Sequence, residues 1–142
     1  MEWYIGVLKK YTVFTGRARR KEFWMFMLFN YIVYFVLYIL AYILAHLTWL
    51  QDILYIPYIY YLAVLFPALG VSIRRLHDTN RSGWFLLLYF IPSIIISKAE
   101  LFSLTYTLTS SVALIIFIIF TVQEGTPGDN KYGPDPKAQE SI

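Results

Sequence analysis

Long apolar stretches alternate with short polar ones along this 142-residue chain. No Lys or Arg lies between Phe23 and Ile73, or between Leu101 and Val122. Since an α-helix rises about 1.5 Å per residue, helices over residues 23–45, 53–73 and 101–122 would be about 34, 31 and 33 Å long. A bilayer has a hydrocarbon core about 30 Å thick, so each stretch predicts a membrane-spanning helix.

A further apolar stretch, Trp84–Ser97, would cover only about 21 Å as a helix. Its flanking residues extend the segment to 82–100, about 28 Å, and Lys98 can reach the interface with its long side chain. We therefore expect a further span over 82–100. The alternative is a re-entrant hairpin broken near Pro92 and Ser93, which would have to bury its unpaired backbone groups.

The two ends of the chain have a different character from the spans. In residues 1–22, Trp3, Val7, Tyr11 and Phe14 recur at helical spacing up to Gly16, which predicts a short amphipathic helix in the headgroup plane. Residues 123–142 are rich in Gly and Pro, which predicts turns that are either disordered or docked. The expected fold is one all-α integral membrane domain over 1–142, a compact bundle of four transmembrane helices with a short N-terminal interfacial helix.

Composition and charge placement add an orientation to this prediction. With 58% hydrophobic and 15% charged residues, the chain is more apolar than an average soluble domain. With four spans, eleven of the twelve Lys and Arg residues fall on one side and only Lys98 falls on the other. Cytoplasmic loops carry the excess of positive charge, so both termini and the loop after the second span are expected in the cytosol.

Three of the polar stretches carry long motifs: FTGRARRKEFW at 14–24, RRLHDTNRSGW at 74–84 and GTPGDNKYGPDP at 125–136. In their residues, order and spacing they resemble the bacterial domain-of-unknown-function family 805, a family of small inner-membrane proteins. The resemblance covers essentially the whole chain. It implies a location in the bacterial inner (plasma) membrane and a compact multi-span helical fold, and it implies no activity, because none is established for the family.

Arginines are concentrated in the first two motifs, both expected on the cytosolic side. The planar guanidinium group suits phosphate, so these side chains could form a site for phosphate or an anionic lipid headgroup. The simpler alternative is that they set the topology and rest against anionic lipid, each contributing about 1 kcal/mol. The candidates are Arg17, Arg19, Arg20, Arg74, Arg75 and Arg81.

Acidic residues within these basic motifs predict structural ion pairs. The candidates are Glu22 and Asp78, with His77 beside Asp78. His77, Asp78 and Ser82 could suggest acid-base catalysis, but neighbours in one short loop generally cannot adopt triad geometry. We therefore expect no catalytic residue and no cofactor.

Further candidates lie outside these two motifs. A metal site is not expected, because the only other histidine, His46, is predicted on the opposite side of the membrane. Asp129 and Asp135 in the tail could pair with the arginine loops. Asn30 is the conspicuous polar residue of the first span and is explained by hydrogen bonding between helices.

The leading functional hypothesis is a non-enzymatic membrane protein whose basic cytosolic face binds anionic lipid headgroups or a protein partner. A homo-oligomer is possible, and no nucleic-acid partner is expected. The alternative is a small oligomeric transporter or channel, with a water-filled path past Asn30. The absence of ionisable residues near the predicted bilayer centre weakens a proton-coupled version of this alternative.

Overall fold

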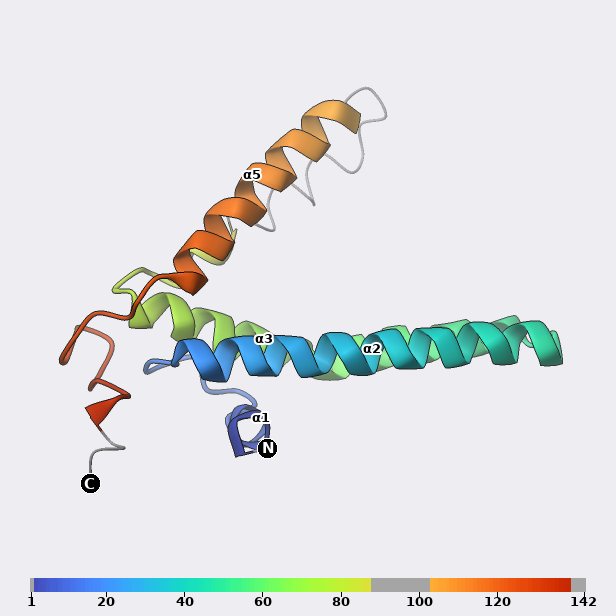
Figure 1. Ribbon diagram of the computed structural model, residues 1–142, viewed down its shortest axis with the longest axis horizontal. Helices are drawn as coiled ribbons and strands as arrows, with labels where there is room; N and C mark the ends of the chain where they lie inside the picture. Colours follow the sequence, from blue (N-terminus) through green and yellow to red (C-terminus); the bar gives the residue numbers. More distant parts are fainter. Residues whose placement is uncertain (1, 88–102, 139–142) are drawn as a thin grey trace. The chain divides into compact units, whose positions relative to one another are not determined.

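A computed structural model describes residues 2–87 and 103–138, which are helical apart from turns, loops and one isolated β-bridge between Asn130 and Gly133 (Figure 1). The all-helical prediction is therefore confirmed for the described residues. The chain divides into two compact units. The first comprises Met1–Val13 and Lys21–Val71, and the second comprises Phe14–Arg20 and Ser72–Ile142.

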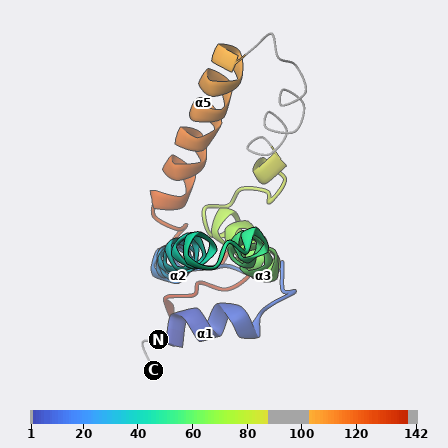
Figure 2. The same ribbon diagram turned by 90° about the vertical axis from the view of Figure 1, so that its right-hand side faces the viewer.

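The first unit is built on a helical hairpin. Helix α2 is Arg20–Thr48, and after the 3-10 helix η1, Gln51–Tyr55, helix α3 (Ile56–Asp78) returns beside it (Figures 1 and 2). At the reversal Trp49 has a left-handed φ of 61°. Arg20–Thr48 and Gln51–Asp78 are both long and apolar enough to cross a membrane.

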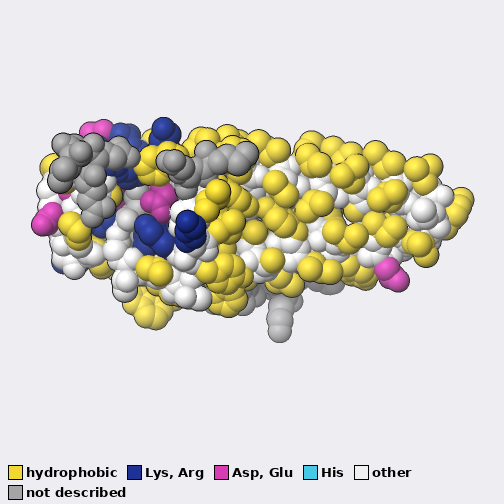
Figure 3. All heavy atoms as spheres, turned by 90° about the horizontal axis from the view of Figure 1, so that it is seen from below, with side chains coloured by type: hydrophobic (Ala, Val, Ile, Leu, Met, Phe, Trp, Pro, Cys, Tyr) yellow, Lys and Arg dark blue, Asp and Glu magenta, His cyan; other side chains and the backbone are white. Residues whose placement is uncertain are grey.

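The face of this hairpin seen in Figure 3 is apolar over most of its length. Of the 18 most apolar consecutive residues of α2, only 6% are buried. The corresponding share in Gln51–Asp78 is 28%. A core helix of a water-soluble protein would have most of this surface covered. A helix that is apolar on all sides yet uncovered is typical of a protein surrounded by hydrocarbon.

Helix α1, Glu2–Lys9, lies across this hairpin (Figure 2). Val7 is fully buried, and the ring of Tyr4 stacks on Phe26 of α2 with centroids 5.3 Å apart. An amphipathic helix at the N-terminus is therefore present, and its apolar face covers part of the hairpin.

The helix is shorter than the sequence pattern predicted. The predicted stripe continued to Phe14, but α1 ends at Lys9 and the chain turns, with the Lys10 amide donating to the Val7 carbonyl over 3.1 Å. Tyr11 then donates its hydroxyl to the Ala63 carbonyl of α3 over 2.6 Å. Tyr11 thus continues the apolar spacing because it contacts α3 from a turn, and it does not belong to a longer α1.

The second unit contains the last seven residues of α3 (72–78), the loop before α2, helix α5 (Ser103–Val122) and the tail. At 20 residues, α5 is about 30 Å long. Phe120 of α5 packs edge-on against Phe85, with ring centroids 5.7 Å apart. Most of the predicted span 82–100 lies outside the described residues, so that prediction stays open.

Candidate functional site

Asp78, in the last turn of α3, lies between two arginines of different motifs. Its Oδ1 accepts from Arg17 Nε over 2.9 Å, and its Oδ2 accepts from Arg75 Nη1, one helical turn earlier. The exposed fractions of Arg75, Asp78 and Arg17 are 0, 4 and 8%. We call these three residues the Asp78 cluster.

The guanidinium groups of the cluster also bind backbone carbonyls. Arg17 Nη1 donates to the carbonyl of Gly128 and Nη2 to that of Thr126, both over 2.6 Å. An arginine carries five N–H donors in a planar fork, so one side chain can join several segments. Arg17 thereby holds the first turns of the tail beside the carboxylate of Asp78.

Arg75 connects the same carboxylate to the end of α5. Its Nε donates to the Thr121 carbonyl over 2.9 Å, and its Nη2 donates to the carbonyl of Gln123. Carbonyls in the last turn of a helix have no partner within the helix. A buried cation is therefore a favourable partner for them, and it also complements the negative end of the helix dipole.

Backbone hydrogen bonds join the same segments around the cluster. The Ala18 amide donates to the Arg74 carbonyl over 3.0 Å, and the Thr126 amide donates to the Asp78 carbonyl over 2.8 Å. The side chain of Asn130 donates to the His77 carbonyl over 3.0 Å. All three sequence motifs thus contribute to one hydrogen-bonded network.

Glycine at position 125 permits the tail to pass close to Asp78. A Cβ placed on Gly125 would collide with the Asp78 carboxylate. Gly128, whose carbonyl receives Arg17, has a φ of 71°, in the left-handed region that glycine adopts at little cost. These two glycines explain why a Gly-rich segment follows α5.

His77 is held by packing and by one backbone contact. Its ring stacks on Tyr132, with centroids 3.9 Å apart and an interplanar angle of 3°. Its Nδ1 lies 3.1 Å from the Gly16 carbonyl and, as the donor, carries the proton. His77 lies beyond the apolar part of α3. Burial lowers its pKa, and the positive charge of Lys131 lowers it further, whereas the hydrogen bond to the Gly16 carbonyl partly opposes this shift. The imidazole is therefore neutral near pH 7.

Asp129 and Asp135 order the tail through backbone amides. Asp129 Oδ1 accepts from the Asp135 amide over 3.1 Å. Asp135 accepts from the amides of Lys137 over 2.9 Å and Gly128 over 3.0 Å. These two bonds, the one from Lys137 first, hold the pKa of Asp135 below its usual value. Both carboxylates thus act as turn acceptors within the tail.

The other candidate residues differ in burial and in partners. Arg74 is 1% exposed, and Glu22 is 8% exposed in the first turn of α2. Arg19 Nε donates to the Pro136 carbonyl over 2.8 Å. Arg20 Nη2 lies 2.6 Å from Glu124 Oε1, and the Arg81 guanidinium lies 4.1 Å from the centre of the Phe120 ring.

Comparison with known families gives a match over nearly the whole chain. Residues 11–134 match the family model described as "Protein of unknown function (DUF805)". The chain belongs to the DUF805 family. The matched range contains the Asp78 cluster and its tail acceptors, and the family resemblance of the three motifs is thereby confirmed.

Two curated proteins of Escherichia coli K12 are similar over nearly their full lengths. "Inner membrane protein YhaI" is 41% identical over 137 residues, which cover 96% of this chain and 97% of that protein. "Inner membrane protein YhaH" is 43% identical over 143 residues, which cover 98% and 99%. No solved structure matches this DUF805 chain significantly.

Sequence reasoning missed the principal acceptors of the arginines. From the sequence, the acids Asp129 and Asp135 are the expected partners, whereas in the structure Arg17 and Arg75 bind carbonyls of the tail and of α5. Every residue has a carbonyl, so residue types alone cannot show which of them receive a cation. The stacking of Tyr132 on His77 was also missed, although an aromatic residue within a Gly- and Pro-rich tail was a signal for docking.

Proposed function

We propose that this DUF805 protein is a non-enzymatic component of the bacterial inner membrane that crosses the bilayer four times with both termini in the cytosol. In this proposal the Asp78 cluster fixes the fold of the cytosolic face, and exposed cations beside the membrane bind anionic lipid headgroups. The inner-membrane names of the similar E. coli proteins and the uncovered apolar surface of α2 support the location.

The observation that carries the proposal is the difference between two groups of cations. Arg17 and Arg75 are buried and bound to Asp78 and to carbonyls, so they are poorly placed to receive a headgroup. Other cations are exposed in the N-terminal region that precedes and begins α2. These are Lys9, Lys10, Arg20 and Lys21.

Two features favour an interfacial position for these exposed cations. Lys9 ends α1 and Lys10 follows it, and Lys21 lies in the first turn of α2, the helix that contains the first predicted span. The Lys21 ammonium lies 5.5 Å from the centre of the Trp3 ring. Tryptophan is enriched at the headgroup level, and each basic residue there contributes about 1 kcal/mol of attraction to anionic lipid.

Catalysis by His77 and Asp78 is not supported by this geometry. Asp78 is buried and paired with two guanidinium groups, and His77 is covered by the Tyr132 ring. Ser82 accepts a bond from the Trp84 amide over 3.4 Å, as expected of a residue that shapes a turn. These contacts favour structural roles for all three residues.

Asn30, on which the transport alternative depended, is likewise engaged in packing. Its Nδ2 donates to the Phe26 carbonyl over 2.7 Å, and its Oδ1 accepts from Tyr60 over 2.6 Å. Inter-helix hydrogen bonding, predicted for Asn30 from the sequence, is confirmed. These bonds occupy the side chain that a water-filled path would have used.

The test is retention of anionic lipid by the purified protein. Nanodiscs containing phosphatidylglycerol and phosphatidylcholine would be analysed by native mass spectrometry for the wild type and for Lys9→Gln/Lys10→Gln/Lys21→Gln. Three lost charges at about 1 kcal/mol each correspond to a roughly hundredfold weaker preference for phosphatidylglycerol.

Thr12→Gln, at an exposed neutral position close to Lys10, is the control and should retain lipid as the wild type does. High salt should weaken retention in the wild type, since these charges are exposed to solvent. An unchanged preference in the triple variant would refute headgroup binding by these lysines.

A further inference from the structure

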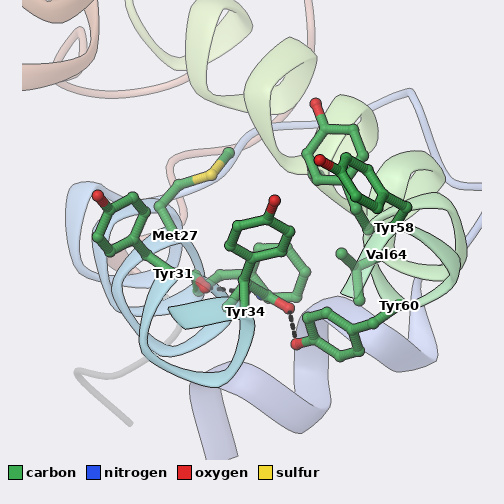
Figure 4. A pocket seen from close by; sticks show the side chains of 10 residues that line it. Met27, Tyr31, Tyr34, Tyr58, Tyr60 and Val64 are labelled. Atoms are coloured by element: carbon green, nitrogen blue, oxygen red, sulfur yellow. Dashed lines mark hydrogen bonds between the residues drawn. The ribbon is translucent and has the colours of Figure 1, made fainter. Parts of the chain in front are cut away.

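The first unit contains a cavity of about 440 Å³ between α2 and α3. Its volume falls within the range of about 300–1,000 Å³ that is usual for small-molecule sites. In Figure 4, Met27, Tyr31 and Tyr34 approach it from α2, and Tyr58, Tyr60 and Val64 approach it from α3. None of the described residues that line the cavity is charged.

The lining is unusually rich in tyrosine. The rings of Tyr34 and Tyr61 meet edge-on with centroids 6.4 Å apart, so they form a continuous aromatic wall across the two helices. Tyr31 and Tyr58 remain 72 and 54% exposed. Aromatic walls favour a planar ligand, because rings stack or meet edge to face.

One part of the lining is a fixed polar group. Asn30 Oδ1 accepts from Tyr60 over 2.6 Å and from Tyr4 of α1 over 3.4 Å, so α1, α2 and α3 meet at this side chain. The amide and the Tyr60 ring are therefore held in place before any ligand binds. A pocket formed in advance binds without the cost of ordering its walls.

Four other tyrosine hydroxyls lack such a partner. Within the described residues, no hydrogen bond is formed by the hydroxyls of Tyr31, Tyr34, Tyr58 or Tyr61. Counted from Phe23, Tyr31 and Tyr34 lie about 12 and 16 Å along α2, well inside a core about 30 Å thick. A hydroxyl in hydrocarbon without an acceptor is costly, so a ligand that supplies an acceptor there would be favoured.

We propose that this cavity binds a neutral, lipid-soluble ring compound with a hydrogen-bond-accepting carbonyl, the chemistry of a quinone. The uncharged lining favours a neutral ligand, and the aromatic walls favour a planar one. The phenolic hydroxyls can donate hydrogen bonds, so they favour a ligand that carries an acceptor. The uncovered helices on either side allow entry from the hydrocarbon. The inference rests on the membrane location in the proposed function and is independent of headgroup binding.

Equilibrium dialysis of 2-methyl-1,4-naphthoquinone against the full chain in phosphatidylcholine nanodiscs tests this site. Binding should saturate at one molecule per chain, above the partition into empty nanodiscs. Val64→Phe fills the cavity and should weaken binding at least tenfold, and Tyr34→Phe removes one donor and should weaken it about tenfold. The control is Ile59→Phe on the same helix, since Ile59 is 64% exposed and does not line the cavity.

Three outcomes would overturn the proposal. The first is uptake no greater than that of empty nanodiscs, and the second is equal binding by the wild type and Val64→Phe. The third is displacement of the bound naphthoquinone by decane as effectively as by excess naphthoquinone itself. That result would show a groove for plain hydrocarbon chains. Because phosphatidylglycerol retention is measured separately, each proposal can fail without the other.

Discussion

Replacing Asp78 by Asn is expected to destabilise the second unit strongly. The carboxylate balances two buried guanidinium groups, Arg17 and Arg75, and its loss leaves both cations close together without a counter-charge. Removing one partner of a buried ion pair typically costs about 3–5 kcal/mol. The midpoint of thermal unfolding in detergent, followed by tryptophan fluorescence, should fall markedly, and the yield of folded protein should fall with it.

The matched control is Glu124→Gln. Glu124 pairs with Arg20 over 2.6 Å, but the two side chains are 73 and 43% exposed, and such pairs contribute about 0–1 kcal/mol. The same change from carboxylate to amide should therefore leave the midpoint nearly unchanged. Equal midpoints for Asp78→Asn and the wild type would show that the cluster contributes little to the fold.

Truncation after Glu124 is expected to have an effect of similar size. It removes the Thr126 and Gly128 carbonyls that accept from Arg17, and the Thr126 amide that donates to Asp78. A hydrogen bond to a charged group contributes about 1.5–3 kcal/mol, so the loss amounts to several kcal/mol. Arg17 would also become accessible, so trypsin should cleave the first motif of the truncated protein faster than that of the full chain.

A chain truncated after Ala138 is the control, because it keeps each of these tail contacts. Its unfolding midpoint and its rate of tryptic cleavage should match those of the full chain. If truncation after Glu124 gave the same values as truncation after Ala138, the tail would be a passive extension.

The helices could be predicted because their signal is local. Runs of apolar residues without Lys or Arg marked 23–45, 53–73 and 101–122, and the structure has helices over 20–48, 56–78 and 103–122. The length of an apolar run can be read from the sequence without knowing which other helices it contacts. The short N-terminal helix was predicted too long because a contact from a turn, that of Tyr11 with α3, imitated helical spacing.

The organisation of the polar residues could be predicted only in part. Counting Lys and Arg residues in the predicted loops places most of the cations on one side of the predicted spans. Such a count does not distinguish a buried arginine from an exposed one. Arg75 and Asp78 are three residues apart, which on a helix places them on one face, and this was a local sign of pairing. The contact of Arg17 with Gly128, 111 residues later, had no such sign.

Cross-linking in the membrane tests most directly whether the three motifs assemble around Asp78. The chain has no cysteine, so Arg20→Cys/Glu124→Cys introduces a single exposed pair, one in the first motif and one at the start of the tail. Arg20→Cys/Thr48→Cys, at the first and last residues of α2 and about 42 Å apart along the helix, is the control pair.

We predict that a short bismaleimide joins the two thiols of Arg20→Cys/Glu124→Cys efficiently within one chain, and that adding Asp78→Asn strongly reduces the yield. A yield no higher than that of the control pair, or one unaffected by Asp78→Asn, would contradict the account.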